Sequence, residues 1–178
     1  MDGLSIRRRI ALDIARSMRK SQEEEHPLRQ LFWECTLRCN LRCQHCGSDC
    51  KSMSDIPDMP ADDFLKVIDL LMPHVNPHEM NVVITGGEPL VRNDLEYVGR
   101  QLYDRGVPWG IVTNGLLLTE HRLDSLRSAG LHNITISLDG LEDTHNWMRN
   151  HPESFKRARN AINAVVCAGD LNFDVVTC

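Results

Sequence analysis

The feature that most constrains the fold is a regular alternation of short apolar runs and amphipathic runs after Pro27. The apolar runs predict strands at 31–34, 82–84, 111–112, 134–136 and 173–176, and the amphipathic runs predict helices at 61–72, 94–103, 120–129 and 154–168. From the second strand onward, successive strands begin a few tens of residues apart, which is the length that a right-handed strand–helix–strand crossover needs. The sequence therefore predicts an α/β fold with parallel, largely buried strands, arranged either as an open sheet or as a barrel.

The composition excludes several other classes of protein. The 178 residues are 42% hydrophobic and 25% charged, as in ordinary globular proteins, and the chain is long enough to bury a core without cross-links. A formal net charge of −5 argues against a nucleic-acid-binding surface, which needs a concentrated basic face. The longest apolar runs are far shorter than the roughly 20 residues that cross a membrane, so we expect no membrane span.

The first part of the chain, residues 1–27, is expected to be an amphipathic helix over 4–20 followed by a linker over 21–27, and residues 28–178 are expected to form the main domain. Apolar side chains recur every four residues on one face of this helix, and arginines and a lysine occupy the other. The recurring apolar residues are Ile10, Ile14 and Met18. Two interpretations are open: a segment that binds a membrane surface or a partner, and a helix laid against the main domain. The second is favoured, because basic faces are usually only solvated.

Residues that carry chemistry follow the predicted strands and do not precede them. A cysteine cluster follows the first strand, Thr85-Gly86-Gly87-Glu88-Pro89 the second, Thr113-Asn114-Gly115 the third and Ser137-Leu138-Asp139-Gly140 the fourth. Parallel strands place their carboxyl ends on the same side of a sheet, which is where α/β proteins build their sites. We therefore expect these four loops to converge on one pocket.

Five of the seven cysteines lie between residues 35 and 50, and the odd total speaks against a complete disulfide framework. We expect a reducing cytoplasm, where clustered thiols more often bind metal. Cys39, Cys43 and Cys46 have the spacing C-x3-C-x2-C, and thiolates select zinc, copper or iron–sulfur centres. A zinc site needs a fourth ligand, which Cys35 or Cys50 could supply, so a non-catalytic zinc-binding module is one alternative. An iron–sulfur cube held by three cysteines would leave one iron open to a small molecule.

This cysteine spacing, followed in order by the TGGEP, TNG and SLDG segments, resembles the radical S-adenosylmethionine (radical SAM) superfamily. His45 stands where the family signature has an aromatic-type residue before its last cysteine, and the resemblance covers about residues 29–178. It implies a partial parallel (βα) barrel, here truncated after the fifth strand, with an N-terminal helix. Because the family's barrel normally has six strand–helix units, the resemblance also implies that the chain is a fragment of a longer protein.

The resemblance implies that the three cysteines of the motif hold a 4Fe–4S cluster and that the amino and carboxylate groups of SAM chelate its fourth iron. Gly86 and Gly87 would let the backbone approach a ligand closely, and the carboxylate of Glu88 would suit the ammonium and sulfonium groups of SAM. The other expected SAM-binding residues are His45, Thr113, Asn114, Ser137 and Asp139. The glycine-containing dipeptides also have a plainer interpretation, as ordinary turns.

The reaction that the resemblance implies starts with one electron passing from the reduced cluster to SAM. This cleaves SAM into methionine and a 5′-deoxyadenosyl radical, which abstracts hydrogen from a substrate. The segment Phe32–Cys39 resembles the SPASM-type branch, whose substrates are peptides and proteins. The expected partners are therefore SAM, a peptide or protein substrate, and an electron donor such as a flavodoxin or ferredoxin. An inactive scaffold that keeps the fold is a further alternative. Residues His145 and Arg149 lie in a stretch similar to the family's H-D-x-x-R-G, without its Asp and Gly, and either face SAM or substrate or only begin a helix.

Overall fold

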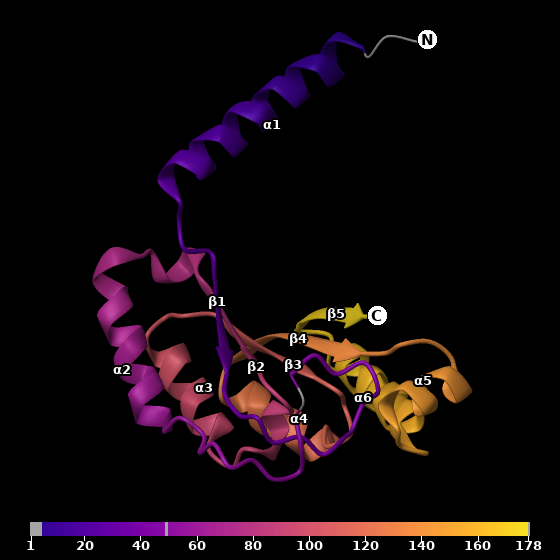
Figure 1. The fold of residues 1–178 in the computed structure, drawn as a ribbon. Helices are drawn as coiled ribbons and strands as arrows, with labels where there is room; N and C mark the ends of the chain where they lie inside the picture. The colour runs from indigo at the N-terminus through magenta and orange to yellow at the C-terminus, as the bar shows by residue number, and fades with distance from the viewer. Residues whose placement is uncertain (1–4, 49, 178) are drawn as a thin grey trace.

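A single parallel sheet of five strands forms the centre of the protein in the computed structural model, which describes residues 5–48 and 50–177 (Figure 1). Its strands are β1 (Gln30–Glu34), β2 (Asn81–Thr85), β3 (Trp109–Thr113), β4 (Leu131–Ser137) and β5 (Asn172–Val176). They lie in the order β1-β2-β3-β4-β5, and every neighbouring pair is parallel. The predicted α/β fold with parallel strands is confirmed.

Helices connect these strands. They are α1 (Ile6–Glu25), α2 (Ala61–Leu71), α3 (Leu95–Asp104), α4 (Glu120–Ser128), α5 (Glu142–Arg149) and α6 (Ser154–Ala168), with single 3₁₀ turns η1 (Met72–His74), η2 (Pro77–Glu79) and η3 (Pro89–Val91). Because the strands follow one another in chain order, right-handed crossovers all place their helices on the same face of the sheet. Accordingly α2 packs on α3, α3 on α4 and α4 on α6. This is the arrangement of a partial βα barrel, since a doubly wound sheet reverses its strand order.

The hydrophobic core lies between the sheet and this row of helices. The central strands supply every second residue to it, as the period of a strand dictates. These fully buried residues are Val82, Ile84, Trp109, Ile111, Ile134 and Ile136. The expectation that the strands are largely buried holds for β2 and β3, whereas β1 and β5 are mostly exposed. The reason is that β1 pairs only with β2 and β5 only with β4, so both lie at the edges of the described sheet.

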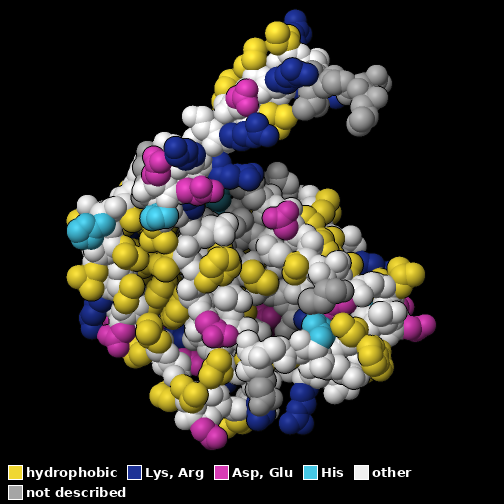
Figure 2. Space-filling view, turned by 45° about the horizontal axis from the view of Figure 1, so that its top comes forward, with side chains coloured by type: hydrophobic (Ala, Val, Ile, Leu, Met, Phe, Trp, Pro, Cys, Tyr) yellow, Lys and Arg dark blue, Asp and Glu magenta, His cyan; other side chains and the backbone are white. Residues whose placement is uncertain are grey.

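The first helix extends away from the rest of the molecule (Figures 1 and 2). It continues to Glu25, so the predicted linker over 21–27 is too long. Glutamate and glutamine favour helix, and Lys20 pairs with Glu24 one turn later at 3.9 Å. Every residue of α1 whose burial is described is exposed. The favoured prediction, a helix laid against the main domain, is therefore wrong: the chain leaves α1 through His26, at φ 44°, and Pro27, and enters β1 without folding back.

Packing between α3 and β3 depends on the absence of a side chain at Gly99. A Cβ atom there would overlap the six-membered ring of Trp109, a side chain with no exposed surface and no room to move. The helix backbone thus lies directly against the indole.

We predict that Gly99→Val lowers the free energy of unfolding by about 2 kcal/mol, because the added carbons overpack a closed part of the core. Urea titration followed by circular dichroism measures this. The matched control is Gly47→Val, since Gly47 is exposed and a Cβ there meets nothing within 4 Å. Equal urea midpoints for the two variants would contradict the packing described.

Candidate functional site

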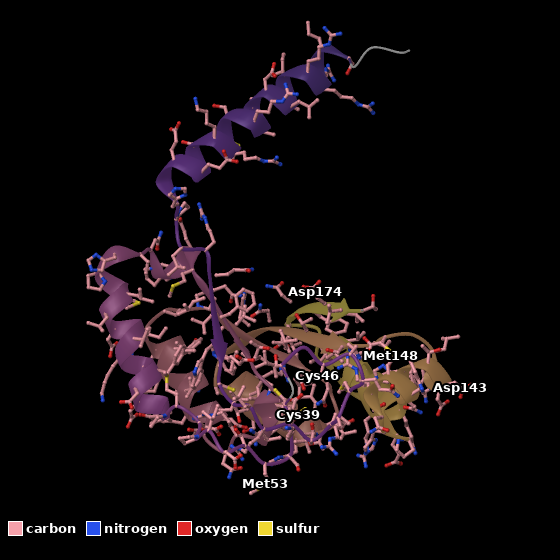
Figure 3. All side chains as sticks on the ribbon, in the orientation of Figure 1. Cys39, Cys46, Met53, Asp143, Met148 and Asp174 are labelled. Atoms are coloured by element: carbon pink, nitrogen blue, oxygen red, sulfur yellow. The ribbon has the colours of Figure 1, made fainter. Side chains whose placement is uncertain are left out.

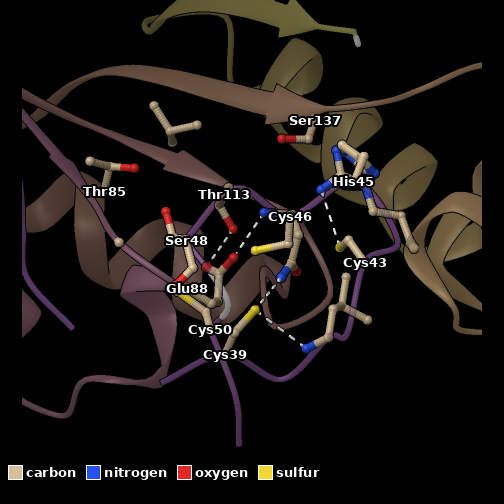
Figure 4. A pocket seen from close by; sticks show the side chains of 16 residues that line it. Cys39, Cys43, His45, Cys46, Ser48, Cys50, Thr85, Glu88, Thr113 and Ser137 are labelled. Carbon is tan, nitrogen blue, oxygen red and sulfur yellow. Dashed lines mark hydrogen bonds between the residues drawn. The ribbon is translucent and has the colours of Figure 1, made fainter. Parts of the chain in front are cut away.

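A pocket lies at the carboxyl ends of the first four strands, on the side of the sheet away from α1 (Figures 3 and 4). The loops after β1, β2 and β3 and the end of β4 all contribute to its wall. The expected site residues that line it are Cys39, Cys43, His45, Cys46, Gly86, Gly87, Glu88, Thr113, Asn114 and Ser137. Convergence of the four segments on one pocket, predicted from parallel strands alone, is what the structure shows.

The loop that carries the cysteines is docked on the glycine pair by backbone contacts. The Gly87 N–H donates to the carbonyl of Thr36 at 2.7 Å. A Cβ on Gly86 would overlap the Thr36 carbonyl oxygen, and one on Gly87 would overlap that of Arg38. Gly86 also has a φ of +139°, which other residues rarely adopt. The sequence predicted close approach of a ligand at these glycines, and the structure shows that the chain's own cysteine loop approaches them.

The carboxylate of Glu88 joins the loop after β2 to the loop after β3. It accepts hydrogen bonds from the Thr113 hydroxyl at 2.7 Å, the Asn114 N–H at 2.8 Å and the Leu90 N–H at 3.1 Å. Burial raises the pKa of the Glu88 carboxyl, and these donors, together with the charge of Arg149, oppose the rise. Both oxygens already accept donors from the protein, so contact between Glu88 and the ammonium of SAM stays a prediction.

The Cys39 sulfur lies among N–H groups. The Leu41 N–H donates to Cys39 Sγ at 3.4 Å, and the side-chain amide of Asn114 lies 4.0 Å from the same sulfur and donates to Asn40 Oδ1 at 2.8 Å. Such donors stabilise thiolate and cluster sulfur. Asn114 therefore links the loop after β3 to the cysteine loop.

The thiols of Cys39 and Cys43 are held in the protonated form when no metal is bound. Burial raises the pKa of Cys39 to about 11 and raises that of Cys43 above its ordinary value, while Cys46 is exposed. A metal that binds here must displace protons. Burial raises the pKa of Cys35 to about 12, and this residue belongs to the hydrophobic core, whereas Cys50 lines the pocket.

The described part of the chain holds no group of three or more His, Cys, Asp or Glu side chains placed to bind one metal ion. In an iron–sulfur cube each cysteine binds a different iron, so its ligands lie further apart than those of a single ion. Three thiols spread over the wall of one pocket fit a cluster of this kind.

Asp139 lies in a buried ion pair beside the pocket and does not line it. Its carboxylate accepts from Arg149 at 2.6 and 3.1 Å, and its backbone N–H donates to His145 Nδ1 at 3.0 Å. Arg149 lines the pocket, and its Nη1 lies 3.7 Å from Cys43 Sγ. The sequence left the roles of Arg149 and His145 open, with the start of a helix as one explanation, but it predicted no range for the helix α5 that carries both. The available signal was their spacing of four residues, which places them on one helical face.

The Radical SAM superfamily model matches residues 33–173. The chain belongs to the radical SAM superfamily.

Curated relatives agree with this assignment. The chain is 33% identical over 150 residues to an AdoMet-dependent heme synthase of Methanosarcina barkeri, and this match covers 84% of the chain and 42% of the synthase. It is 37% identical over 122 residues to a GTP 3′,8-cyclase of Staphylococcus saprophyticus, and this match covers 66% of the chain and 36% of the cyclase. The chain thus spans about two fifths of the length of these enzymes.

Solved structures share the fold. Streptococcus suis SuiB bound to S-adenosylmethionine superimposes with a TM-score of 0.70 at 17% identity, over 99% of this chain and 41% of SuiB. The structure of anSMEcpe with bound AdoMet gives 0.67 at 20% identity, over 85% of this chain and 43% of anSMEcpe. The partial barrel is the fold of these radical SAM proteins.

We predict that Glu88→Gln lowers the free energy of unfolding by about 1–3 kcal/mol, because the amide NH₂ must face the N–H of either Asn114 or Leu90 and leave it without an acceptor. The pH dependence adds a second signature. Because the folded-state pKa of Glu88 is raised, the folded protein binds a proton at Glu88 at a higher pH than the unfolded chain does. The contribution of this proton binding to stability is therefore lost as pH rises through the folded-state pKa. The advantage of the wild type over the variant should grow as pH falls from about 8 to about 4.

Urea unfolding of iron-free protein across that pH range provides the measurement. The control is Glu153→Gln, an exposed carboxylate for which a change within about 0.5 kcal/mol is expected. An effect of Glu88→Gln as small as that of the control, with no pH trend, would contradict the bridging role of Glu88.

Proposed function

We propose that residues 28–178 form the core of a radical SAM enzyme, in which Cys39, Cys43 and Cys46 hold a 4Fe–4S cluster and SAM binds beside it. The observation that supports this most is that the three cysteines line one pocket together with Gly86, Gly87 and Glu88. When bound, the cluster and SAM supply the electron and the 5′-deoxyadenosyl radical with which the superfamily abstracts hydrogen. The relatives named as enzymes support a catalytic role over an inactive scaffold.

The chain's own side chains and N–H groups would then bind the cluster and SAM and orient them. The N–H groups near Cys39 and the guanidinium of Arg149 near Cys43 offset negative charge on cluster sulfur. Ser137 offers a hydroxyl along the pocket wall for the polar groups of SAM, whereas the Thr113 hydroxyl donates to Glu88. His45 lies on the same wall, and its buried Nδ1 has no hydrogen-bond partner among the residues that the structure describes.

The electron donor and the substrate form a finer part of the proposal. Cys46 is exposed, so an electron carrier such as a flavodoxin or ferredoxin has an approach to the cluster from that side. A peptide or protein substrate is supported by the resemblance of the segment Phe32–Cys39 to the peptide-modifying branch. The curated relatives, in contrast, are named for heme and GTP. Incubation with each substrate class, followed by detection of 5′-deoxyadenosine, distinguishes a peptide or protein substrate from the compounds for which the relatives are named.

Anaerobic reconstitution with iron and sulfide tests the cluster. We predict a brown protein with about four irons per chain, and we expect Cys43→Ser to lose most of that iron. Cys167→Ser is the matched control, because Cys167 is exposed on α6 and lies outside the pocket. Tightly bound zinc in place of iron, or equal iron in the two variants, would contradict the proposal.

A second prediction concerns the glycine pair. Gly87→Ala should lower the iron content at least about twofold without unfolding the protein, because the new Cβ displaces the Arg38 carbonyl and lies 3.0 Å from the Cβ of Cys39. Iron analysis and circular dichroism together give the result. Gly47→Ala, one residue after Cys46, adds the same atom where no neighbour lies within 4 Å and should keep its iron. Full iron content in Gly87→Ala would show that the cysteine loop does not depend on this contact.

A further inference from the structure

The helix α1 has no partner within the described chain. Four of its five large apolar side chains form one stripe and are more than half exposed, and the fifth, Leu12, lies on the other side of the helix and is 43% exposed (Figure 2). The exposed fractions in the stripe are Ile6 75%, Ile10 55%, Ile14 55% and Met18 60%. Four large apolar groups at a regular spacing on one exposed helix indicate a surface that something else covers.

The opposite side of α1 is strongly basic. Residues 6–20 contain six of the twenty Lys and Arg of the chain but one of its twenty-five Asp and Glu, in a protein whose total charge is −5. That single acid, Asp13, already pairs with Arg16 at 3.3 Å. Lys20 pairs with Glu24 at 3.9 Å, and residues 6–20 still carry five more cations than acids beside the apolar stripe, so this segment complements a surface that is apolar and anionic at once.

The shape of the stripe distinguishes a flat surface from a second helix. Residues four apart are rotated by about 40° on an α-helix, so the stripe from Ile6 to Met18 turns through roughly 120°. A coiled-coil partner instead needs apolar residues every 3.5 positions on average, which keeps them in one narrow seam. A broad apolar arc flanked by arginines is typical of helices that lie in the plane of a bilayer interface.

We propose that α1 binds the surface of an anionic lipid bilayer, with the apolar stripe between the acyl chains and the flanking cations on the phosphates. No helix among the described residues is long and apolar enough to cross a membrane, so α1 would lie on the bilayer. The helix joins β1 at the amino end of the strand, whereas Cys39 and Cys46 lie near the carboxyl ends (Figures 1 and 3). Attachment through α1 leaves the pocket open.

Flotation of the purified chain with vesicles tests the proposal. We expect binding to phosphatidylcholine vesicles that contain about one quarter phosphatidylglycerol, with binding to pure phosphatidylcholine at least about tenfold weaker and a loss of binding at high salt. The triple variant Arg8→Glu/Arg16→Glu/Arg19→Glu should lose more than about tenfold in vesicle affinity. Ile10→Asp/Ile14→Asp should lose it as well, because it removes the middle of the apolar stripe.

The matched control reverses three exposed cations elsewhere, in Lys156→Glu/Arg157→Glu/Arg159→Glu on α6, and should bind as the wild type does. Circular dichroism of each variant verifies that it is folded. Absence of vesicle binding, equal binding to neutral vesicles, or equal loss in the α6 control would overturn the proposal. A dimer in solution that the Ile10/Ile14 variant dissociates, without vesicle binding, would show that a second copy covers the stripe.

Discussion

The contact on which the site depends is the backbone junction between the cysteine loop and the glycine pair. The N–H groups of Gly87 and Glu88 donate to the carbonyls of Thr36 and Arg38 at 2.7 and 3.0 Å, which fixes the start of the cysteine loop against the end of β2. This is possible because the parallel register aligns Glu34 with Thr85, so both strands end at the same level. Sheet geometry thus sets the position of the cysteine loop before any metal binds.

The Glu88 side chain beside this junction is buried, and burial of a carboxylate costs free energy unless donors surround it. Glu88 is 1% exposed, and its carboxylate remains there only because three donors surround it. The pair of Asp139 and Arg149 repeats the arrangement on the other side of the pocket, where Arg149 also approaches Cys43. Buried charges with fixed partners hold the loops after β2, β3 and β4 around the cysteines, so the site is organised in advance of its ligands.

Most of this arrangement could be predicted from the sequence, because it follows from local patterns. Alternating apolar runs predicted the parallel strands, and the position of the chemistry after each strand predicted their convergence. Helix α5 escaped prediction because its eight residues are mostly polar, and the partner of Asp139 depends on how that helix packs. The exposure of α1 was also mispredicted, since an amphipathic pattern shows that a face is apolar but does not show what covers it.

The central claim is that three cysteines hold an iron–sulfur cube whose fourth iron is free for SAM. Mössbauer spectroscopy of protein reconstituted with ⁵⁷Fe, recorded with and without SAM, tests it most directly. The account predicts that SAM changes the isomer shift of one iron in four and leaves the other three unaltered. Four irons that stay equivalent in protein saturated with SAM would contradict it, and would indicate a fourth protein ligand, for which Cys50 on the pocket wall is a candidate.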